Sequence, residues 1–182
     1  MNNDRLAAIA ELTASGMDYE IVPGEVWGRP CRVFKNAPRT LRDLYQTASS
    51  EETFLVFEDE RFTFAETNDR VAQIANILTD QFGVEKGDRI AISMRNFPEW
   101  VFAFNAATSI GAIAVAMNSL WLSEEMEFGL KDSGAKVLFA DQERLDRLAP
   151  VRENLDLQVI SVRATSSSAN TWALEELLTG QV

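Results

Sequence analysis

The side chains that most often carry out catalysis are nearly absent from this sequence. Its 182 residues include no histidine and one cysteine, Cys31. Without histidine, the Ser-His-Asp and Cys-His forms of nucleophilic catalysis and histidine-ligated metal sites are excluded. Cys31 has no predicted base beside it, and we interpret it as a small, half-buried residue at the start of an extended run. The sequence therefore assigns no catalytic residue and no metal ligand.

Three loops could still hold a small ligand, because each joins a predicted strand to the helix that follows it. They are Arg95-Asn96-Phe97, the segment from Asn118 to Leu122, and Asp141-Gln142. In open parallel sheets, ligands bind outside the carboxyl ends of the strands, close to helix N-termini. Arg95 could bind an anion there, but we favour a surface arginine with Asn96 as the helix cap. Trp121 could line an apolar pocket, although packing of its loop onto the core is the commoner role.

Phosphate-binding motifs are missing from these loops. None of the three contains glycine, whereas a dinucleotide fingerprint needs three glycines and a P-loop needs two glycines and a lysine. The segment from Thr165 to Thr171 has hydroxyl groups but neither glycine nor lysine, so we interpret it as a solvated loop. Glu124 and Glu125 are adjacent, and we expect them to cap a helix rather than to act as an acid–base pair. No cofactor-binding residue is assigned.

Charge and hydropathy narrow the classes of partner. The chain has 28 acidic and 17 basic residues, which gives a formal net charge of −11, and it lacks the positive stripe that binds nucleic acid. Between Arg144 and Arg152, arginines alternate with acids, a pattern typical of a solvated helix face. No apolar run approaches the roughly 20 residues that span a bilayer, and Met1 to Glu11 lacks the apolar core of a signal peptide. We expect a cytoplasmic protein that binds neither nucleic acid nor an anionic membrane surface.

From Gly87 onward, short apolar strands alternate with longer helical segments. The predicted strands are Arg89–Met94, Ala112–Met117, Lys136–Ala140 and Leu157–Val162. The predicted helices are Pro98–Ile110, a helix capped by Ser123 that ends at Gly134, Asp141–Asn154 with a break around Pro150, and a short final helix, Trp172–Leu178. This alternation is typical of βαβ units and predicts an α/β fold, mainly a parallel sheet with helices on both faces.

Helix-start signals and a hairpin precede this region. Thr40 is the predicted N-cap of a helix that ends near Ser49. The segment Thr63-Phe64-Ala65-Glu66 has the spacing of a capping box and begins a second helix. Its apolar stripe contains Val71, Ile74, Ala75, Leu78 and Phe82. Phe54–Phe57 and Arg61–Thr63 flank a short acidic turn, which predicts an antiparallel hairpin.

The first 39 residues are interpreted as an N-terminal extension, and residues 40–182 as an α/β subdomain. Within the extension, Asp4 to Ser15 has the pattern of a short amphipathic helix. Met17 to Ala37 contains two prolines and two glycines, and we expect it to be a loop with short extended pieces.

Five short segments, in fixed order, carry a family resemblance. They are Phe62–Glu66, Gly87–Ile92, Asn96–Trp100, Gly111–Val115 followed by Asn118, and Asp132–Leu138. Together they resemble the N-terminal region of the adenylate-forming (AMP-binding) superfamily, which includes acyl-CoA synthetases, peptide-synthetase adenylation domains and beetle luciferases. The resemblance is greatest to a bacterial acyl-CoA synthetase, of the kind that activates fatty or aromatic acids.

That resemblance implies a reaction for the parent enzyme. ATP, with Mg, converts a carboxylic acid to an acyl-adenylate, and the acyl group is then transferred to CoA. The family's phosphate loop, nucleotide-binding motifs and catalytic lysine are expected after Val182, so the 182 residues are expected to be an inactive fragment. The missing remainder of the enzyme is its expected partner, and apolar surface left uncovered would favour homo-oligomers.

Two positions depart from the family pattern, and two other functions fit the same residues. Ala116 stands where proline is common. Ser109 stands where many acyl-CoA synthetases have a basic residue near the CoA phosphates, so no CoA contact is assigned to this chain.

The alternative functions are a self-contained α/β module that binds a small ligand at its strand ends and a regulatory partner of a full-length enzyme.

Overall fold

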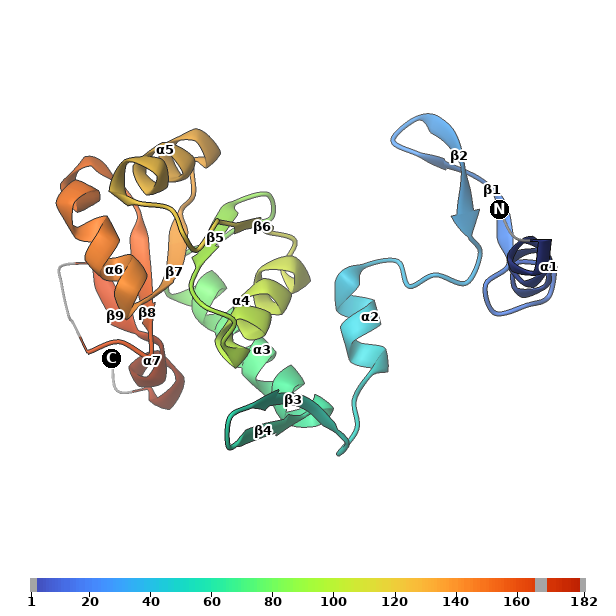
Figure 1. The fold of residues 1–182 in the computed structure, drawn as a ribbon, viewed down its shortest axis with the longest axis horizontal. Coiled ribbons are helices and arrows are strands. Elements are labelled where there is room, and N and C mark those ends of the chain that lie inside the picture. The colour runs from blue at the N-terminus through green and yellow to red at the C-terminus, as the bar shows by residue number, and fades with distance from the viewer. Residues whose placement is uncertain (1–2, 166–169, 181–182) are drawn as a thin grey trace. The chain divides into compact units, whose positions relative to one another are not determined.

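The computed structural model describes residues 3–165 and 170–180. The chain divides into two compact units, and the division falls between Arg39 and Thr40. The first unit contains helix α1 (Asn3–Leu12) and an antiparallel hairpin of β1 (Ile21–Val26) and β2 (Arg29–Phe34) (Figure 1). We predicted a loop with short extended pieces between Met17 and Ala37; the extended pieces are present, but they are two paired strands of six residues each rather than parts of a loop. Pro23 and Gly24 lie inside β1 and gave a loop signal, but a two-stranded ribbon has free edges that tolerate them.

The turn of this hairpin is set by Trp27 and Gly28, whose φ angles are 52° and 75°. Two consecutive positive φ values match the twist of the flanking strands in a two-residue hairpin loop. Cys31 lies within β2 and is exposed, so its predicted half-burial was also wrong. Most of β2 is exposed because little within its own unit covers the ribbon.

The second unit begins with two capped helices separated by a hairpin. Helix α2 (Leu41–Thr47) starts at Thr40, as predicted, and the hydroxyl of Thr40 accepts the Asp43 N–H at 3.1 Å. The predicted hairpin is confirmed as β3 (Thr53–Phe57) and β4 (Glu60–Thr63), which leads directly into α3 (Phe64–Asp80). Four of the five predicted stripe residues of α3 are buried, and the fifth, Phe82, is half-buried.

The capping box at the start of α3 is confirmed, and it gives a stability prediction. The Thr63 hydroxyl accepts the Glu66 N–H at 3.1 Å, and the Glu66 carboxylate accepts the Thr63 N–H at 2.8 Å. We expect Thr63→Ala to lower the free energy of unfolding by about 1 kcal/mol, because an N-terminal amide loses its acceptor. Urea denaturation measures this loss. Thr63→Ser keeps the hydroxyl and should retain most of the stability, and equal losses in both variants would contradict the assignment.

The core of the second unit is a five-stranded parallel sheet in the order β6-β5-β7-β8-β9. Its strands are β5 (Arg89–Ser93), β6 (Ile113–Ala116), β7 (Val137–Asp141), β8 (Gln158–Val162) and β9 (Thr171–Ala173). The helices that connect its strands are α4 (Pro98–Ser109), α5 (Ser123–Ser133) and α6 (Gln142–Leu148) with the 3-10 turn η1 (Ala149–Asn154), and α7 (Leu174–Thr179) follows the last strand. The predicted α/β class is therefore confirmed, including the break in the helix near Pro150.

Helices cover both faces of the sheet because alternate strand residues point in opposite directions. Ile90, Ile92 and Phe139 contribute to one cluster, with α3, α4 and α7 (Figure 1). Their neighbours along the same strands, Ala91 and Leu138, contribute to the other cluster, with α5 and α6. All five of these side chains are fully buried. Among the described residues, no helix is long and apolar enough to cross a bilayer.

The starts of α7 and α5 differ from the prediction. Thr171–Ala173 is strand β9, paired with β8, so the last helix begins at Leu174 rather than Trp172. A three-residue strand is too short to show a recognisable alternation. Helix α5 has Leu122 as its N-cap, because the Glu125 carboxylate accepts the Leu122 N–H at 2.9 Å. The Ser123 hydroxyl instead donates to the Arg147 carbonyl at 2.6 Å.

Candidate functional site

A topological switch point lies at the carboxyl edge of the sheet, where successive connections run to opposite sides of β5. From β5 the chain passes through α4 to the edge strand β6, and it then returns to the opposite side of β5 as β7. The loops after β5 and β7 therefore leave the sheet in opposite directions, and such a crevice is the usual ligand position in open α/β sheets. A cavity of about 500 Å³ lies there, lined by Phe57, Glu58, Arg95, Asn96, Phe97, Ser119, Leu120, Glu143 and Arg144.

Asp141, the last residue of β7, occupies the centre of this edge. Its carboxylate accepts the backbone N–H of Arg95 at 2.9 Å and the backbone N–H of Arg144 at 3.1 Å. It also pairs with the Arg144 guanidinium at 3.1 Å, and its side chain is 7% exposed. Asp141 thus caps α6 and fixes the loop after β5 at the same time.

Arg144 connects the third loop of the edge. Its side chain is 2% exposed, so the prediction of a solvated helix face was wrong at this position. The guanidinium donates to the Ser119 carbonyl through Nε at 2.9 Å and Nη2 at 2.5 Å, besides its bond to Asp141. The sequence showed a helix with alternating charges but not that the first turn of α6 packs beneath the loop after β6. Arg144 therefore ties all three predicted loops into one network.

Glu143 and Arg147 extend the network toward solvent. Burial alone would raise the pKa of Glu143, but Arg144, Arg147 and Arg95 outweigh this effect, so the pKa lies below its ordinary value. Glu143 pairs with Arg144 at 2.9 Å and with Arg147, whose Nη1 also donates to the Ser119 carbonyl at 3.0 Å. The edge is held by charges that are already paired within the protein.

The other residues that the sequence suggested as ligand-binding candidates have structural roles where the structure describes them. Arg95 is a surface side chain, 68% exposed, that pairs with Glu143 at 3.3 Å. The prediction that Asn96 caps the following helix was wrong, because the N-cap of α4 is Phe97. Trp121 packs its loop onto the core as expected: its ring lies so close to Gly129 of α5 that a Cβ there would approach it to 2.5 Å. Of the segment from Thr165 to Thr171, residues 166–169 lie outside the described residues.

Arg163 is a conspicuous residue that the sequence analysis missed. It follows β8 with a φ of 49°, in the left-handed region that non-glycine residues seldom adopt. Its guanidinium makes two bonds of 2.7 Å to Glu60 of β4, and its Nε donates to both carboxylate oxygens of Glu99, at the start of α4, at 2.9 and 3.1 Å. It also lies 5.0 Å from the ring centre of Phe57. Arg163 therefore clamps the β3–β4 hairpin against the sheet, a role without any local sequence signal.

Asp141 works against phosphate binding at the start of α6. Its carboxylate accepts the backbone N–H of Arg144, in the first turn of α6, and the backbone N–H of Arg95, in the loop that precedes α4. At the start of α6 a carboxylate therefore already occupies the position that an anion would take, and it would repel a phosphate. We therefore assign no residue of this edge to ATP, Mg or CoA. The network holds three loops in place, and its paired groups offer no free acid, base or nucleophile.

Comparison with curated proteins connects this scaffold to a family. A model described as "AMP-binding enzyme" matches residues 44–179. 4-coumarate–CoA ligase 3 of Arabidopsis thaliana is 36% identical over 96 residues, 53% of this chain and 17% of the relative. Acetyl-coenzyme A synthetase of Pseudoalteromonas translucida is 30% identical over 141 residues, 73% of this chain and 22% of the relative. The chain thus spans about a fifth of the length of these relatives.

Solved structures show the same fold. The anthranilate CoA ligase AuaEII, in complex with anthranoyl-AMP, superposes with a TM-score of 0.73 at 25% identity, over 78% of this chain and 28% of that one. The acyl-CoA synthetase of Brucella canis superposes with a TM-score of 0.70 at 20% identity, over 98% of this chain and 32% of that one, a likeness of fold alone. These matches agree with the family model and with the parallel sheet described above. The chain therefore belongs to the AMP-binding enzyme family, among relatives that are AMP-forming acyl- and aryl-CoA ligases.

Proposed function

We propose that this chain supplies the N-terminal α/β scaffold of an AMP-forming carboxylic acid–CoA ligase, and that residues 1–182 alone do not form an acyl-adenylate. The observation that carries the proposal is the family match over residues 44–179, on a sheet at whose carboxyl edge Asp141 accepts the backbone amides of Arg95 and Arg144. In the whole enzyme, ATP would activate a carboxylic acid as its acyl-adenylate, and CoA would then take the acyl group.

The division of roles follows from the network at the sheet edge. Asp141, Arg144 and Glu143 satisfy one another, so this part of the enzyme contributes rigidity rather than reacting groups. Residues beyond the scaffold would bind ATP, Mg and CoA and supply the catalytic lysine. Reactive geometries must be held within fractions of an ångström, and a braced sheet edge is suited to support them.

Apolar surface near the edge strand β6 supports a partner for this scaffold. Ile113 of β6 is 52% exposed, and Leu120, Leu122 and Phe128 are 63–73% exposed. Because exposed apolar side chains and an open strand edge favour association, we propose that the rest of the ligase covers these side chains and that isolated chains self-associate. We place the enzyme in the cytoplasm, where an exposed thiol such as Cys31 stays reduced.

The test is ATP–pyrophosphate exchange, which reports acyl-adenylate formation directly. Purified residues 1–182 should give no exchange above the protein-free background with acetate, octanoate, benzoate or 4-coumarate. Full-length 4-coumarate–CoA ligase 3 from Arabidopsis thaliana, assayed with 4-coumarate, is the positive control. Exchange by the 182-residue chain would contradict the proposal.

A second measurement addresses the scaffold role separately from inactivity. Sequencing the gene downstream of the Val182 codon is expected to reveal a Gly/Ser/Thr-rich loop that ends in Lys-Gly. A stop codon at this point would contradict the proposal even if the chain is inactive.

A further inference from the structure

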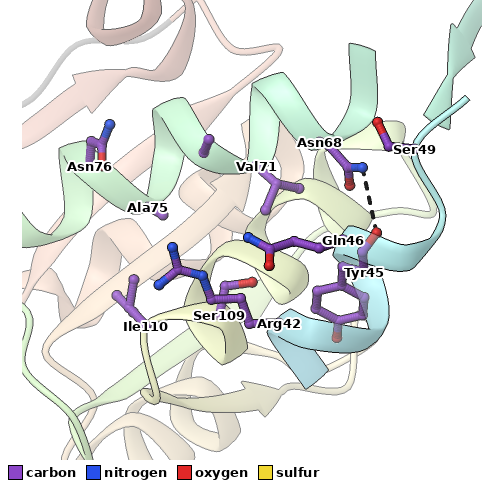
Figure 2. A pocket seen from close by; sticks show the side chains of 11 residues that line it. Arg42, Tyr45, Gln46, Ser49, Asn68, Val71, Ala75, Asn76, Ser109 and Ile110 are labelled. Atoms are coloured by element: carbon purple, nitrogen blue, oxygen red, sulfur yellow. Dashed lines mark hydrogen bonds between the residues drawn. The ribbon is translucent and has the colours of Figure 1, made fainter. Parts of the chain in front are cut away.

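A second cavity lies away from the sheet edge and shares no lining residue with the cavity there. It has a volume of about 340 Å³, within the range of small-molecule sites. Helix α2 forms one wall, α3 forms another, and the end of α4 closes it (Figure 2). The lining consists of Arg42, Tyr45, Gln46, Ser49, Asn68, Val71, Ala72, Ala75, Asn76, Ser109 and Ile110.

The walls of this cavity are joined by specific contacts. The Tyr45 hydroxyl of α2 lies 3.2 Å from the Thr108 hydroxyl of α4. Since the Thr108 hydroxyl also bonds to the Phe104 carbonyl at 2.8 Å, Tyr45 is the donor of the pair. The Asn68 amide of α3 donates to the Ala48 carbonyl at 3.4 Å, just beyond α2. These contacts hold α2 beside α3 and α4 and keep the space between them open.

The polar side chains of the cavity are free to bind a ligand. Arg42, Gln46, Ser49, Asn76 and Ser109 use none of their side-chain donors or acceptors within the part of the chain that the structure describes. Figure 2 shows Arg42 and Gln46 reaching from α2 toward the end of α4, where Ser109 and Ile110 lie. Four neutral polar groups and a guanidinium thus surround one space.

The charge of the cavity contrasts with that of the chain. Arg42 is the only charged residue in the lining, although the chain carries a formal net charge of −11. A guanidinium presents paired N–H donors that match the two oxygens of a carboxylate or phosphate. Beside it, Val71 and Ala75 are buried and form an apolar floor with Ile110. The lining is therefore complementary to a ligand with one anionic end and one apolar part.

We propose that this cavity binds a small organic oxyanion, whose carboxylate or phosphate pairs with Arg42 and whose apolar part contacts Val71, Ala75 and Ile110. The amides of Gln46 and Asn76 and the hydroxyl of Ser109 complete the hydrogen bonds of the ligand. The proposal does not depend on the ligase assignment, because it concerns binding to these residues and not turnover.

Isothermal titration calorimetry with four probes tests the site: inorganic phosphate, AMP, benzoate and octanoate. Saturable binding of at least one probe is expected. Comparing the first two probes with the last two distinguishes a phosphate head from a carboxylate head. Comparing phosphate with AMP reports the contribution of the attached organic group, and comparing benzoate with octanoate reports the preferred shape of the apolar part. Arg42→Gln should weaken binding at least tenfold, and Arg42→Lys, which keeps the charge but loses the fork, should weaken it less.

Arg61→Gln is the matched control. Arg61 is an exposed arginine of β4 that bonds only the carbonyls of Glu58 and Glu60, so its loss should leave probe affinity unchanged. Since Arg42 is exposed and has no partner within the described residues, the urea midpoint of Arg42→Gln should equal that of the wild type. The absence of saturable binding of every probe, or an equal affinity in the wild type and Arg42→Gln, would overturn the proposal.

Discussion

Replacing Arg144 with methionine is expected to lower the free energy of unfolding of this chain by about 3–5 kcal/mol, as is typical when one partner of a buried ion pair is removed. The side chains of Arg144 and Asp141 are 2% and 7% exposed. Methionine fills similar volume but leaves the Asp141 carboxylate without its buried countercharge and removes two bonds from the Ser119 carbonyl. Urea denaturation, followed by circular dichroism, measures the loss.

Arg95→Met is the control within the same network. Arg95 also pairs with a carboxylate, but its side chain is 68% exposed, and an exposed ion pair contributes less than about 1 kcal/mol. Its backbone N–H, which bonds to Asp141, is unchanged by the substitution. If the two variants lose equal stability, burial is not what makes the Asp141–Arg144 pair important.

Arg163→Met should have the second largest effect, about 2–3 kcal/mol of lost stability, concentrated in the β3–β4 hairpin. The variant loses four charge-assisted bonds, two to Glu60 and two to Glu99, and leaves Glu99, whose side chain is 9% exposed, without its cation. Amide hydrogen exchange should quicken across residues 53–63, whereas β7 at the centre of the sheet should change less. Arg61→Met, in the same hairpin, removes bonds to backbone carbonyls only and should leave this exchange near the wild-type rate.

Acid should release the same hairpin without any substitution. The bonds from Arg163 hold the pKa of Glu60 below its ordinary value of 4.5. A carboxylate whose pKa is lower in the folded state adds stability at every pH above the unfolded value, and this stability is lost as the pH falls through the folded value. The protection of the hairpin amides, measured as the exchange rate relative to the intrinsic rate of an unstructured amide at the same pH, should therefore stay constant from pH 7 to about 4.5 and fall below it, and Glu60→Gln should remove most of this fall.

The sequence predicted those features that depend on neighbours along the chain. The N-cap at Thr40, the capping box at Thr63, the end of α5 at Gly134 and four of the five parallel strands were all predicted from local spacing. The family resemblance rested on similar scaffold signals and was confirmed by the match over residues 44–179.

The features that the sequence did not reveal depend on distant partners. Arg163 and Glu60 are 103 positions apart, and Arg144 and Ser119 are 25 apart. An arginine among alternating charges looks the same in a sequence whether it faces water or a buried carbonyl, because the distinction is made by the element that packs over it. The cavity beside Arg42 was missed for the same reason, since it is formed by three helices that are separated in the chain.

The order of strands also has a consequence for biosynthesis. Strand β5 is the first strand of the sheet to be made, yet it lies between β6 and β7, and β8 and β9 attach only through β7. Parallel neighbours cannot close as local hairpins, because each must wait for the intervening helix. While the ribosome extends the chain, β5, four of whose five residues are buried in the folded protein, therefore remains unpaired on one edge until Val137–Asp141 has emerged. Nascent-chain mispairing, and the demand for chaperones that it creates, should be greatest in that interval.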